Sequence, residues 1–438
     1  MIERAATIQV CDDCGAELPP LDARTQCADC GGLLSLRYAA PAERGLALRQ
    51  LFDQRLALGS AAPAASRGGV WRFRELVVPD VRDAEIVTQP EGNTALVHRE
   101  RVAAWCGLDA LHLKLEGANP TGSFKDRGMT VAVTQAGRVG AAAVACASTG
   151  NTSASLAAYA ALAGLPALVL VPNGQVSLGK LAQSIAYGAR TLLVRGDFDD
   201  CLRLVRAAAE TLGVYLANSI NPYRLAGQKT IVLEMLQQLG WRAPDWIVVP
   251  AGNLGNTAAF GAALGEAVEL GLIDRLPRIA AVQASGAAPF AASFREEFRT
   301  RHTVRAATVA TAIRIGNPAS YDRAVRAIRQ TKGVVIDLPD AALLDAKAVV
   351  DASGVGCEPA SAASVAGVRA LVADGTIRRD ETVVAVLTGH ILKDSAILLD
   401  YHRDAEPPNA YSNRPIEIDA DLSAVERVLA AAQRGGGR

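Results

Sequence analysis

The sequence predicts an α/β fold built from open, twisted, parallel sheets, with a small cysteine-containing module at its N-terminal end. Short apolar runs alternate with longer helical runs through most of the 438 residues. The clearest short runs, which we interpret as strands, are residues 167–171, 191–194, 246–249, 279–283 and 383–387. Strands that alternate with helices form parallel sheets covered by helices on both faces. Four closely spaced cysteines precede this alternation and predict a separate module.

The composition is typical of an enzyme and not of a nucleic-acid-binding or membrane protein. The chain has 45 basic and 45 acidic residues, so no basic surface for nucleic acid is expected. Its first residues lack the apolar core of a secretory signal. The longest apolar stretch, residues 154–172, is divided by Gly164-Leu165-Pro166 into a helix and a strand too short to span a bilayer. We therefore expect a cytoplasmic protein with no membrane partner.

The stretch from Gly122 to Arg127 reads Gly-Ser-Phe-Lys-Asp-Arg and presents a lysine at the start of a helix. Turn residues precede it at 119–122, and residues 129–136 contain no Gly or Pro. A lysine amine can form a Schiff base with a carbonyl cofactor, and a helix N-terminus favours an anion. Pyridoxal 5'-phosphate offers both groups. Alone, a Lys-Asp-Arg run is more often a solvated first turn of a helix.

A polar loop at 148–152 reads Ser-Thr-Gly-Asn-Thr and lies between an apolar run and a helical run. Ligand groups in open α/β sheets gather at such strand-to-helix turns. The hydroxyls, the Asn151 amide and free N–H groups could hold a carboxylate or a phenolic oxygen. The alternative is a cluster of residues that cap the helix, since Ser, Thr and Asn all do so.

A glycine loop follows the strand at 246–249 and reads Pro-Ala-Gly-Asn-Leu-Gly-Asn-Thr from residue 250. Glycines let backbone N–H groups turn toward one anion, and the dipole of the following helix adds to the attraction. The loop is not a P-loop or a dinucleotide fingerprint, because the spacing differs. A phosphate is the expected guest.

A threonine, Thr388, ends the strand at 383–387 and begins the sequence Thr-Gly-His. A hydroxyl there can hydrogen-bond a ring nitrogen and, unlike a carboxylate, would leave a pyridine mostly unprotonated. The alternative is an ordinary turn threonine.

Together these segments resemble the fold-type II pyridoxal-phosphate enzymes, which have a tryptophan synthase β-like fold, and within them the threonine synthases. The resemblance runs from about Gln89 to Asp394. The segments that carry it most specifically are Asn-Ser-Ile-Asn-Pro-Tyr-Arg at 218–224, Ile-Arg-Ile-Gly-Asn-Pro at 313–318 and Thr-Gly-His at 388–390. The match also includes Cys-Glu-Pro-Ala-Ser at 357–361. One departure is Ile391, where the family usually has a second glycine.

The resemblance implies a role for each matched residue. Lys125 would hold the cofactor and move protons, with Phe124 beside it. The cofactor phosphate would lie on the loop residues Gly252, Asn253, Leu254, Gly255 and Asn256. Asn151 would bond the ring hydroxyl, and Thr388 the ring nitrogen. Ser148, Thr149 and Thr152 would take the substrate carboxylate. Arg224, Asn218 and Ser219 would take a substrate phosphate, because an Arg fork suits a phosphate monoester.

The implied reaction converts O-phospho-L-homoserine and water into L-threonine and phosphate. Other readings stay open at this point: a cysteate synthase-like enzyme acting on another phosphorylated amino acid, or a threonine dehydratase. A catalytically silent binding protein that keeps the fold is a third, which an intact Lys125 disfavours. The expected small-molecule partner is a phosphorylated amino acid. The chain itself is expected to form a homodimer.

The four N-terminal cysteines are Cys11, Cys14, Cys27 and Cys30. They form two Cys-x-x-Cys pairs, each followed by glycine, a pattern typical of a tetrahedral structural zinc site. Redox activity is the weaker alternative, because neither pair lies in a strand-helix thioredoxin pattern. The other four cysteines stand in apolar surroundings and are expected to be buried, unpaired thiols.

The expected domains are a zinc-ribbon-like module at 1–40, a large cofactor-binding domain at 41–118 and 215–427, and a small domain at 119–214. The two larger domains follow from the fold-type II resemblance, which places the cofactor between them. A frayed tail is expected at 428–438, where the chain ends in Gly-Gly-Gly-Arg.

Overall fold

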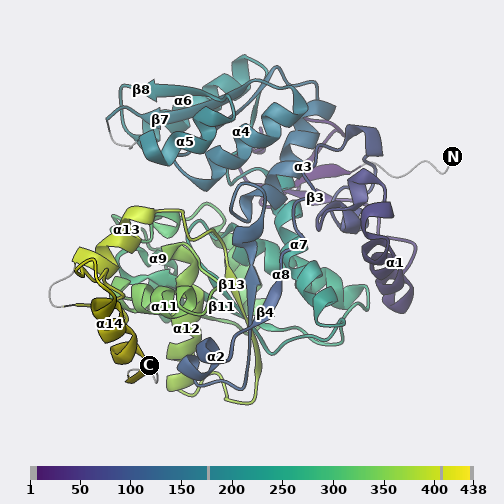
Figure 1. Cartoon of the computed structure of the whole chain (residues 1–438). Coiled ribbons are helices and arrows are strands. Elements are labelled where there is room, and N and C mark those ends of the chain that lie inside the picture. The colour runs from purple at the N-terminus through teal and green to yellow at the C-terminus, as the bar shows by residue number, and fades with distance from the viewer. Residues whose placement is uncertain (1–6, 175–177, 405–407, 435–438) are drawn as a thin grey trace. The chain divides into compact units, whose positions relative to one another are not determined.

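Figure 1 shows a computed structural model of the chain, which describes residues 7–174, 178–404 and 408–434. The chain divides into two compact units, Met1–Asp394 and Ser395–Arg438. Each unit is described by itself below. Within the described ranges, no helix is both long enough and apolar enough to cross a membrane.

The larger sheet of the first unit has six strands in the order β12-β11-β10-β13-β5-β4. All neighbouring strands are parallel except β4 and β5. The strands are β4 (Leu96–His98), β5 (Ala110–Leu115), β10 (Trp246–Pro250), β11 (Arg278–Ala284), β12 (Val334–Leu338) and β13 (Thr382–Leu387). The strands expected at 246–249, 279–283 and 383–387 are confirmed.

Helices cover both faces of this sheet, because alternate strand residues point to opposite sides. Ile247 and Val249 of β10 belong to one apolar core, and Trp246 and Val248 belong to the other. The first core is completed by α1 (Gly45–Ala57), α7 (Pro222–Gln238), α8 (Gly255–Glu269), α9 (Pro289–Arg295) and α10 (Tyr321–Gln330). The second is completed by α2 (Glu100–Cys106), α11 (Asp340–Asp351) and α12 (Pro359–Ala373).

The smaller sheet has four parallel strands in the order β8-β7-β6-β9 and lies in the upper part of Figure 1. Its strands are β6 (Ala143–Ala147), β7 (Ala167–Pro172), β8 (Arg190–Val194) and β9 (Val214–Leu216). Its helices are α3 (Lys125–Arg138), α4 (Asn151–Ala163), α5 (Leu178–Ala186) and α6 (Phe198–Thr211). The apolar residues of β6 divide between two cores, so this sheet is also covered on both faces.

Helices α3 and α7 cross in close contact because glycines face each other where they meet. A Cβ atom on Gly128 would lie 2.8 Å from the carbonyl oxygen of Arg224. A Cβ atom on Gly227 would lie 1.8 Å from the carbonyl oxygen of Arg127, a distance that no side chain can occupy. The crossing therefore brings the first turn of α3 next to the first turn of α7.

The cysteine module forms a three-stranded antiparallel sheet in the order β2-β1-β3. Its strands are β1 (Ile8–Cys11), β2 (Glu17–Leu18) and β3 (Leu34–Arg37). The Asp12 carboxylate accepts hydrogen bonds from Arg323 Nε at 2.5 Å and Arg326 Nη2 at 3.1 Å, both on α10. The module is thereby fixed to the domain of the six-stranded sheet.

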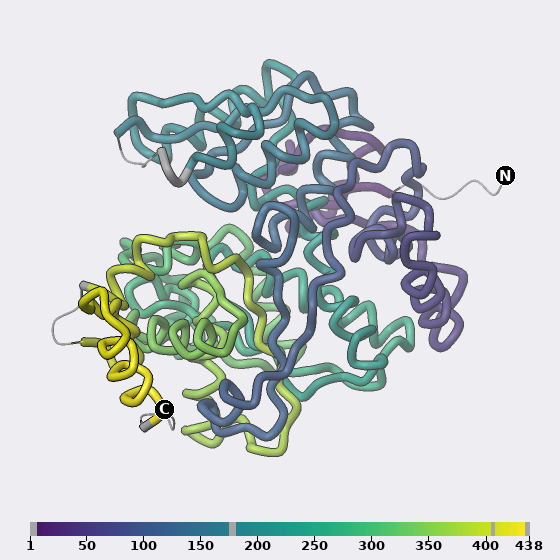
Figure 2. The backbone as a smooth tube through the Cα atoms, viewed as in Figure 1, coloured from purple at the N-terminus to yellow at the C-terminus, as the bar shows by residue number. Residues whose placement is uncertain are grey.

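Short turns of 3-10 helix connect the main elements. Those of the segment between the module and the sheets are η1 (Gly59–Ala61), η2 (Ala64–Ser66), η3 (Trp71–Leu76) and η4 (Asp83–Glu85). Those near the six-stranded sheet are η5 (Glu116–Ala118), η6 (Ser285–Ala287) and η7 (Thr311–Ile313). Figure 2 follows the backbone through all of them.

The second unit contains α13 (Ser395–Leu399), a π-helical turn at Asp400–Asp404, and α14 (Leu422–Arg434). It begins at Ser395, whereas the sequence suggested that the large domain continues to residue 427. Helix α14 also continues through residues 428–434, where a frayed tail was expected. The last four residues, 435–438, and the first six, which belong to the expected module, lie outside the described ranges.

Candidate active site

The predicted site residues gather where strands of both sheets end. Asn253, after β10, donates through Nδ2 to Ser219 Oγ at 2.5 Å. The backbone N–H of Phe124 donates to the Thr388 carbonyl oxygen, after β13, at 3.0 Å. Asn151, after β6, donates to Glu358 at the start of α12. Loops distant in the sequence therefore form one site, as open α/β sheets commonly arrange.

Lys125 is the first residue of α3, as the sequence predicted. Its Nζ lies 3.8 Å from the centre of the Phe124 ring, and Phe124 itself packs against the first apolar core. Burial and the positive charge of Arg224 together lower the pKa of the Lys125 amine to about 7, against the opposing charge of Glu358. A large share of Lys125 is therefore a neutral amine at neutral pH, the form that attacks a carbonyl carbon.

The glycine loop enters α8 in a strained conformation. Leu254, which immediately precedes the helix, has φ +63°, a left-handed value that a leucine rarely adopts. Gly252 must lack a side chain, because a Cβ atom there would lie 2.9 Å from the Ile313 Cα atom. Within the described residues, the buried atoms Asn256 Oδ1 and Thr257 Oγ1 have no hydrogen-bond partner. The first turn of α8 therefore has polar groups available to a ligand.

The polar loop before α4 does not cap that helix. Its N-cap residue is Gly150, and no side chain accepts a hydrogen bond there. The capping alternative is therefore wrong, and the N-terminus of α4 is open to an anion. Ser148, Thr149 and Thr152 are partly exposed around it. The Ser148 hydroxyl accepts from Gly150 N at 3.4 Å.

Arg224 is 1% exposed, yet no carboxylate within the described residues pairs with it. Its Nη1 donates to the Ala217 carbonyl oxygen at 3.1 Å, and its buried Nε has no partner in the same part of the chain. Burial lowers the pKa of Arg224 to about 10. An unpaired buried guanidinium is costly, so this site favours an anionic ligand.

Two predicted neighbours of Arg224 are engaged in holding loops together. Asn218 bonds the backbone of Ala147 twice, through Oδ1 and Nδ2, each at 3.1 Å. Ser219 accepts from Asn253, which also accepts from Ala319 N at 2.7 Å. These contacts tie the loop before α7 to the end of β6 and to the glycine loop.

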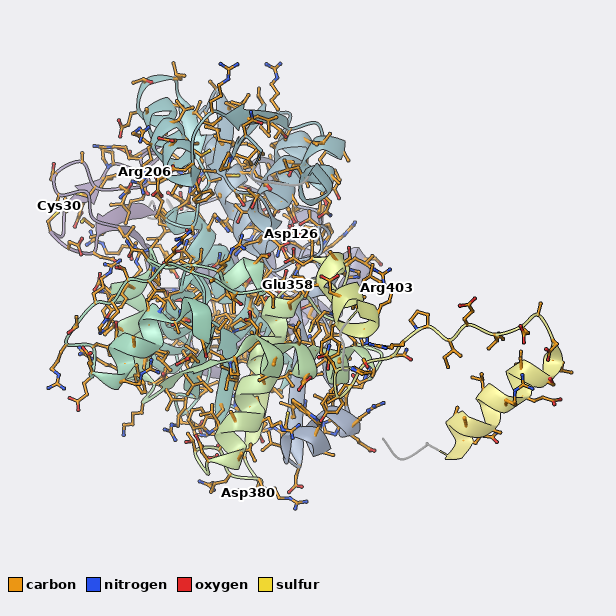
Figure 3. The ribbon with its side chains drawn as sticks, turned by 90° about the vertical axis from the view of Figure 1, so that its left-hand side faces the viewer. Cys30, Asp126, Arg206, Glu358, Asp380 and Arg403 are labelled. Carbon is orange, nitrogen blue, oxygen red and sulfur yellow. The ribbon has the colours of Figure 1, made fainter. Side chains whose placement is uncertain are left out.

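Glu358 lies at the centre of the site, although its sequence segment gave it no assigned role. It is 2% exposed, and its Oε2 accepts from Asn151 Nδ2 at 2.9 Å. Its Oε1 lies 3.1 Å from Thr388 Oγ1, which lies 2.8 Å from Ser361 Oγ. Burial raises the pKa of the Glu358 carboxyl, while its hydrogen bonds with Asn151 and Thr388 and the charge of Lys125 oppose that shift. Figure 3 labels Glu358, at the start of α12, and Asp126, which follows Lys125 at the start of α3.

The sequence did not reveal a role for Glu358, because its hydrogen-bond partners Asn151 and Thr388 are distant along the chain. A glutamate before Pro359 also reads as the ordinary start of a helix, which it is. The available signal was its place in the Cys-Glu-Pro-Ala-Ser segment that supported the family resemblance. Gly389 supports the arrangement, since a Cβ atom there would lie 2.4 Å from the Glu358 carboxyl carbon.

A buried network of charges fixes the start of α3 beneath the site. Arg127 donates from Nε to Glu116 Oε2 at 2.7 Å and from Nη2 to Glu234 Oε1 at 2.8 Å. Lys114 Nζ donates to the same Glu234 oxygen at 2.6 Å. Arg127 therefore anchors α3 to η5 and α7, two residues after Lys125.

Ile391, the departure from the family pattern, packs against Gly356. A Cβ atom on Gly356 would lie 3.0 Å from the Ile391 Cβ and Cδ1 atoms. Gly356 has φ +73° and lies two residues before Glu358. The branched side chain therefore supports the segment that leads into Glu358.

The four module cysteines lie close together and none is in a disulfide. Their sulfur atoms are all within 4.8 Å of one another, with Cys11–Cys30 at 3.4 Å and Cys14–Cys27 at 3.6 Å. Four thiolates held tetrahedrally about 2.3 Å from one zinc ion would lie about 3.8 Å apart. The donor set and its spacing fit zinc. The expected thiols at Cys106, Cys146, Cys201 and Cys357 are confirmed as buried and unpaired.

The site fits pyridoxal 5'-phosphate on three independent grounds. Lys125 offers a neutral amine, and α8 offers an uncapped N-terminus with unpartnered polar atoms beside it. Asn151 and Thr388, expected to bond the ring, are held in one hydrogen-bonded group by Glu358.

Comparison with known proteins identifies the family. The family described as pyridoxal-phosphate dependent enzyme matches residues 87–389. Threonine synthase of Methanosarcina acetivorans is 43% identical over 421 residues, which cover 96% of this chain and 98% of the relative. The chain belongs to the threonine synthase family. Threonine synthase of Methanocaldococcus jannaschii is 41% identical over 424 residues, which cover 96% of this chain and 99% of that relative.

Solved structures agree on the fold. Escherichia coli threonine synthase has a TM-score of 0.68 at 19% identity, covering 97% of this chain and 100% of that one. Processed threonine deaminase isoform 2 of Solanum lycopersicum has a TM-score of 0.61 at 18% identity. The match covers 82% of this chain and 95% of that one. The fold-type II, tryptophan synthase β-like architecture expected from the sequence is confirmed.

Proposed function

We propose that this chain converts O-phospho-L-homoserine and water into L-threonine and phosphate, as a carbon–oxygen lyase acting on a phosphate ester. The observation that carries the proposal is Arg224, a buried guanidinium with no carboxylate partner within the described residues. Family membership supports the same substrate, since the two relatives that each align with 96% of this chain are threonine synthases. When bound, pyridoxal 5'-phosphate supplies the electron-withdrawing ring that allows protons to leave carbon atoms of an amino acid.

In the proposed reaction, separate groups of residues would hold the cofactor phosphate, the substrate phosphate and the substrate carboxylate. Gly252, Asn253, Leu254, Gly255 and Asn256 would hold the cofactor phosphate at the N-terminus of α8, as P-loops do for nucleotides. Ser148, Thr149 and Thr152 would hold the substrate carboxylate at the uncapped start of α4. Arg224, with Asn218 and Ser219, would hold the leaving phosphate.

Lys125 would hold the cofactor and then move protons among the substrate carbon atoms. Its lowered pKa, about 7, suits a group that must both accept and return a proton near neutral pH. Arg224 raises the fraction of neutral amine through its charge, and an anion bound to Arg224 would weaken that effect. Substrate binding would therefore make Lys125 a stronger base at the moment it is needed.

The two enzymatic alternatives differ in what Arg224 must do. A threonine dehydratase acts on a substrate with no phosphate and has no use for a buried unpaired arginine. A cysteate synthase-like enzyme would keep the phosphate site but would act on a phosphoserine, which is shorter by one carbon. We therefore expect the position of Arg224 relative to Lys125 to select the longer phosphohomoserine.

A comparison of substrates tests the proposal. The purified, cofactor-loaded enzyme is given phosphohomoserine, phosphoserine or threonine, and the release of phosphate and of ammonia is followed. Phosphate release from phosphohomoserine, with threonine as the other product, is expected. Faster phosphate release from phosphoserine, or ammonia from threonine at a higher rate, would replace the proposed function by one of the alternatives.

We propose in addition that the four module cysteines bind a structural zinc ion, because four protein ligands leave no open coordination position. The homodimer and the cytoplasmic location stay predictions. Light scattering of the purified protein would check the dimer, and fractionation of cells would check the location.

A further inference from the structure

Glu358 is a buried carboxyl group whose nearest groups are hydrogen-bonding partners rather than a cation. Its two oxygens contact Asn151 Nδ2 and Thr388 Oγ1. Within the described residues, no ion pair to Glu358 is formed within 4.0 Å. A buried carboxyl without a paired cation favours its neutral form, because burial penalises the charge.

The donors and acceptors around Ser361 determine the direction of its hydrogen bond to Thr388. Ser361 Oγ accepts from the backbone N–H of Gly389 at 2.9 Å. Within the described residues, the acceptor in reach of the Ser361 hydrogen is Thr388 Oγ1 at 2.8 Å. Because a buried hydroxyl hydrogen is rarely left without an acceptor, Ser361 donates to Thr388.

The protonation state of Glu358 then decides what the Thr388 hydroxyl can do. Asn151 donates to Glu358 Oε2, so the proton of a neutral carboxyl lies on Oε1 and points at Thr388. Both lone pairs of Thr388 Oγ1 are then occupied, and its own hydrogen is left for a further acceptor. If Glu358 were ionised, that hydrogen would turn to Oε1, and Thr388 would have a lone pair free instead.

We propose that protonated Glu358 and Ser361 act together as positioning residues that make the Thr388 hydroxyl a donor toward the ring nitrogen of the cofactor. The inference rests on the proposed function, in which Thr388 faces that nitrogen. A hydroxyl that can only donate stabilises a ring nitrogen without a proton. Glu358 thereby keeps the ring nitrogen of the cofactor unprotonated. It does so because its own proton is used in the hydrogen bond to Thr388.

The arrangement depends on pH in one direction. The pKa of Glu358 is raised, chiefly by burial, so the protonated form persists above the usual range of a glutamate and is lost as the pH rises through that raised value. The charged groups that face Glu358 are Lys125 of α3 and Lys393 and Asp394 of the loop after β13, with the Cys357 thiol beside it. Their own titrations can also affect a bound cofactor, so the test must separate them from Glu358.

Glu358→Gln makes that separation. The glutamine carbonyl accepts from Asn151 and its NH2 group donates to Thr388, as the neutral carboxyl does, but it cannot ionise. The probe is pyridoxal 5'-phosphate labelled with the heavy nitrogen isotope in its ring, bound to the full-length protein and observed by NMR. We expect wild type to give the signal of an unprotonated ring nitrogen below the raised pKa of Glu358, with a change as the pH rises through that pKa. Glu358→Gln should keep that signal and lose the part of the change that belongs to Glu358.

Ser361→Ala provides a second readout if the first variant does not fold. It removes one donor to Thr388, so the hydroxyl gains a free lone pair and the ring-nitrogen signal should move toward the protonated position. A protonated ring nitrogen in wild type below the raised pKa of Glu358 would overturn the inference. A pH-dependent change as large in Glu358→Gln as in wild type would do so as well. Failure of the wild-type protein to load cofactor or to release phosphate would instead contradict the proposed function.

Discussion

Arg224 and Lys125 influence each other at the residue scale. Both are surrounded by protein, both carry lowered pKa values, and each lies at the first turn of its helix. The close crossing of α3 and α7 places the positive charge of Arg224 near the Lys125 amine, so protonation of that amine is unfavourable until an anion arrives. The phosphate of the substrate would offset this unfavourable charge on binding. That gain would contribute to the affinity of the enzyme for the substrate.

Removal of Arg224 tests this reading. Each charge-assisted hydrogen bond to a phosphate contributes about 1.5–3 kcal/mol, so Arg224→Ala should lower kcat/KM for phosphohomoserine by about tenfold to a few hundredfold. The visible absorbance of the lysine-bound cofactor should persist, because the cofactor phosphate has its own loop. Steady-state kinetics and an absorbance spectrum provide both measurements. Arg206→Ala, at an exposed position on α6, is the matched control and should change neither.

A rise in the pKa of Lys125 should accompany the loss of the Arg224 charge, since that charge is one of the two causes that lower it. An Arg224→Ala enzyme that turns phosphohomoserine over at the wild-type rate would remove the assignment. So would one that no longer binds cofactor.

At the scale of elements, the site depends on how closely α3 approaches α7. Gly227 is the tightest point, since a Cβ atom there would lie 1.8 Å from the backbone of Arg127. The helices would have to move apart to admit even one methyl group, and Arg127 would leave its place between Glu116 and Glu234. Lys125 and Arg224 belong to the same two turns, so their separation would change as well.

Gly227→Ala should therefore destabilise the protein despite the better helix propensity of alanine. Overpacking typically costs about 1–3 kcal/mol, and here backbone atoms block the added methyl, so the upper end of that range is expected. Gly137→Ala on α3 is the control, because nothing lies within 4 Å of its Cβ position. It should stabilise the helix by about 0.5–1 kcal/mol. Denaturant unfolding followed by circular dichroism measures both; equal effects of the two substitutions would show that the crossing is not tight.

Much of this element-scale structure could be predicted from sequence, and the limits have physical causes. The run Trp246–Pro250 followed by a glycine loop and an alanine-rich helix identified β10, its turn and α8, because hydrophobic period and turn chemistry are local. The role of Gly227 could not be seen, because it depends on a helix about a hundred positions earlier in the chain. Glu358 was missed for the same reason: its hydrogen-bond partners are brought to it by folding.

At the scale of the whole molecule, the cysteine module is held by its own strands and by α10. Its apolar core is small and consists of Cys11, Leu18, Cys27 and Leu34 with Ala16 beside it. A core of this size cannot offset the entropy of ordering the segment, so a bound metal is expected to stabilise it. The Asp12 carboxylate, bonded to Arg323 and Arg326, depends on that order to keep its place.

Metal analysis should find about one zinc ion per chain. Cys14→Ser should lose the metal and lower the stability of the module, measured by hydrogen exchange of residues 8–37. The domains of the two large sheets should change much less. Cys201→Ala, which removes a buried thiol outside the module, should keep the zinc. A zinc-free wild-type protein, or a disulfide within each cysteine pair, would contradict the metal site.

The division at Ser395 was not anticipated from sequence. The sequence carries no local signal for this boundary, because periodicity alone does not say to which compact unit a helix such as α14 belongs. The departure at Ile391 was noticed, but its contact with Gly356 required the fold.

In the proposed function, the chain removes phosphate from Cγ of phosphohomoserine and adds water at Cβ. The most direct test of this proposal is turnover in water labelled with the heavy oxygen isotope, with mass spectrometry of both products. In the proposed reaction the carbon–oxygen bond at Cγ breaks with both electrons leaving on phosphate, Cγ gains a proton, and the hydroxyl at Cβ comes from water. We therefore predict threonine that carries the label in its hydroxyl group and phosphate that carries none. Labelled phosphate together with unlabelled homoserine would show simple hydrolysis of the ester and would contradict the account.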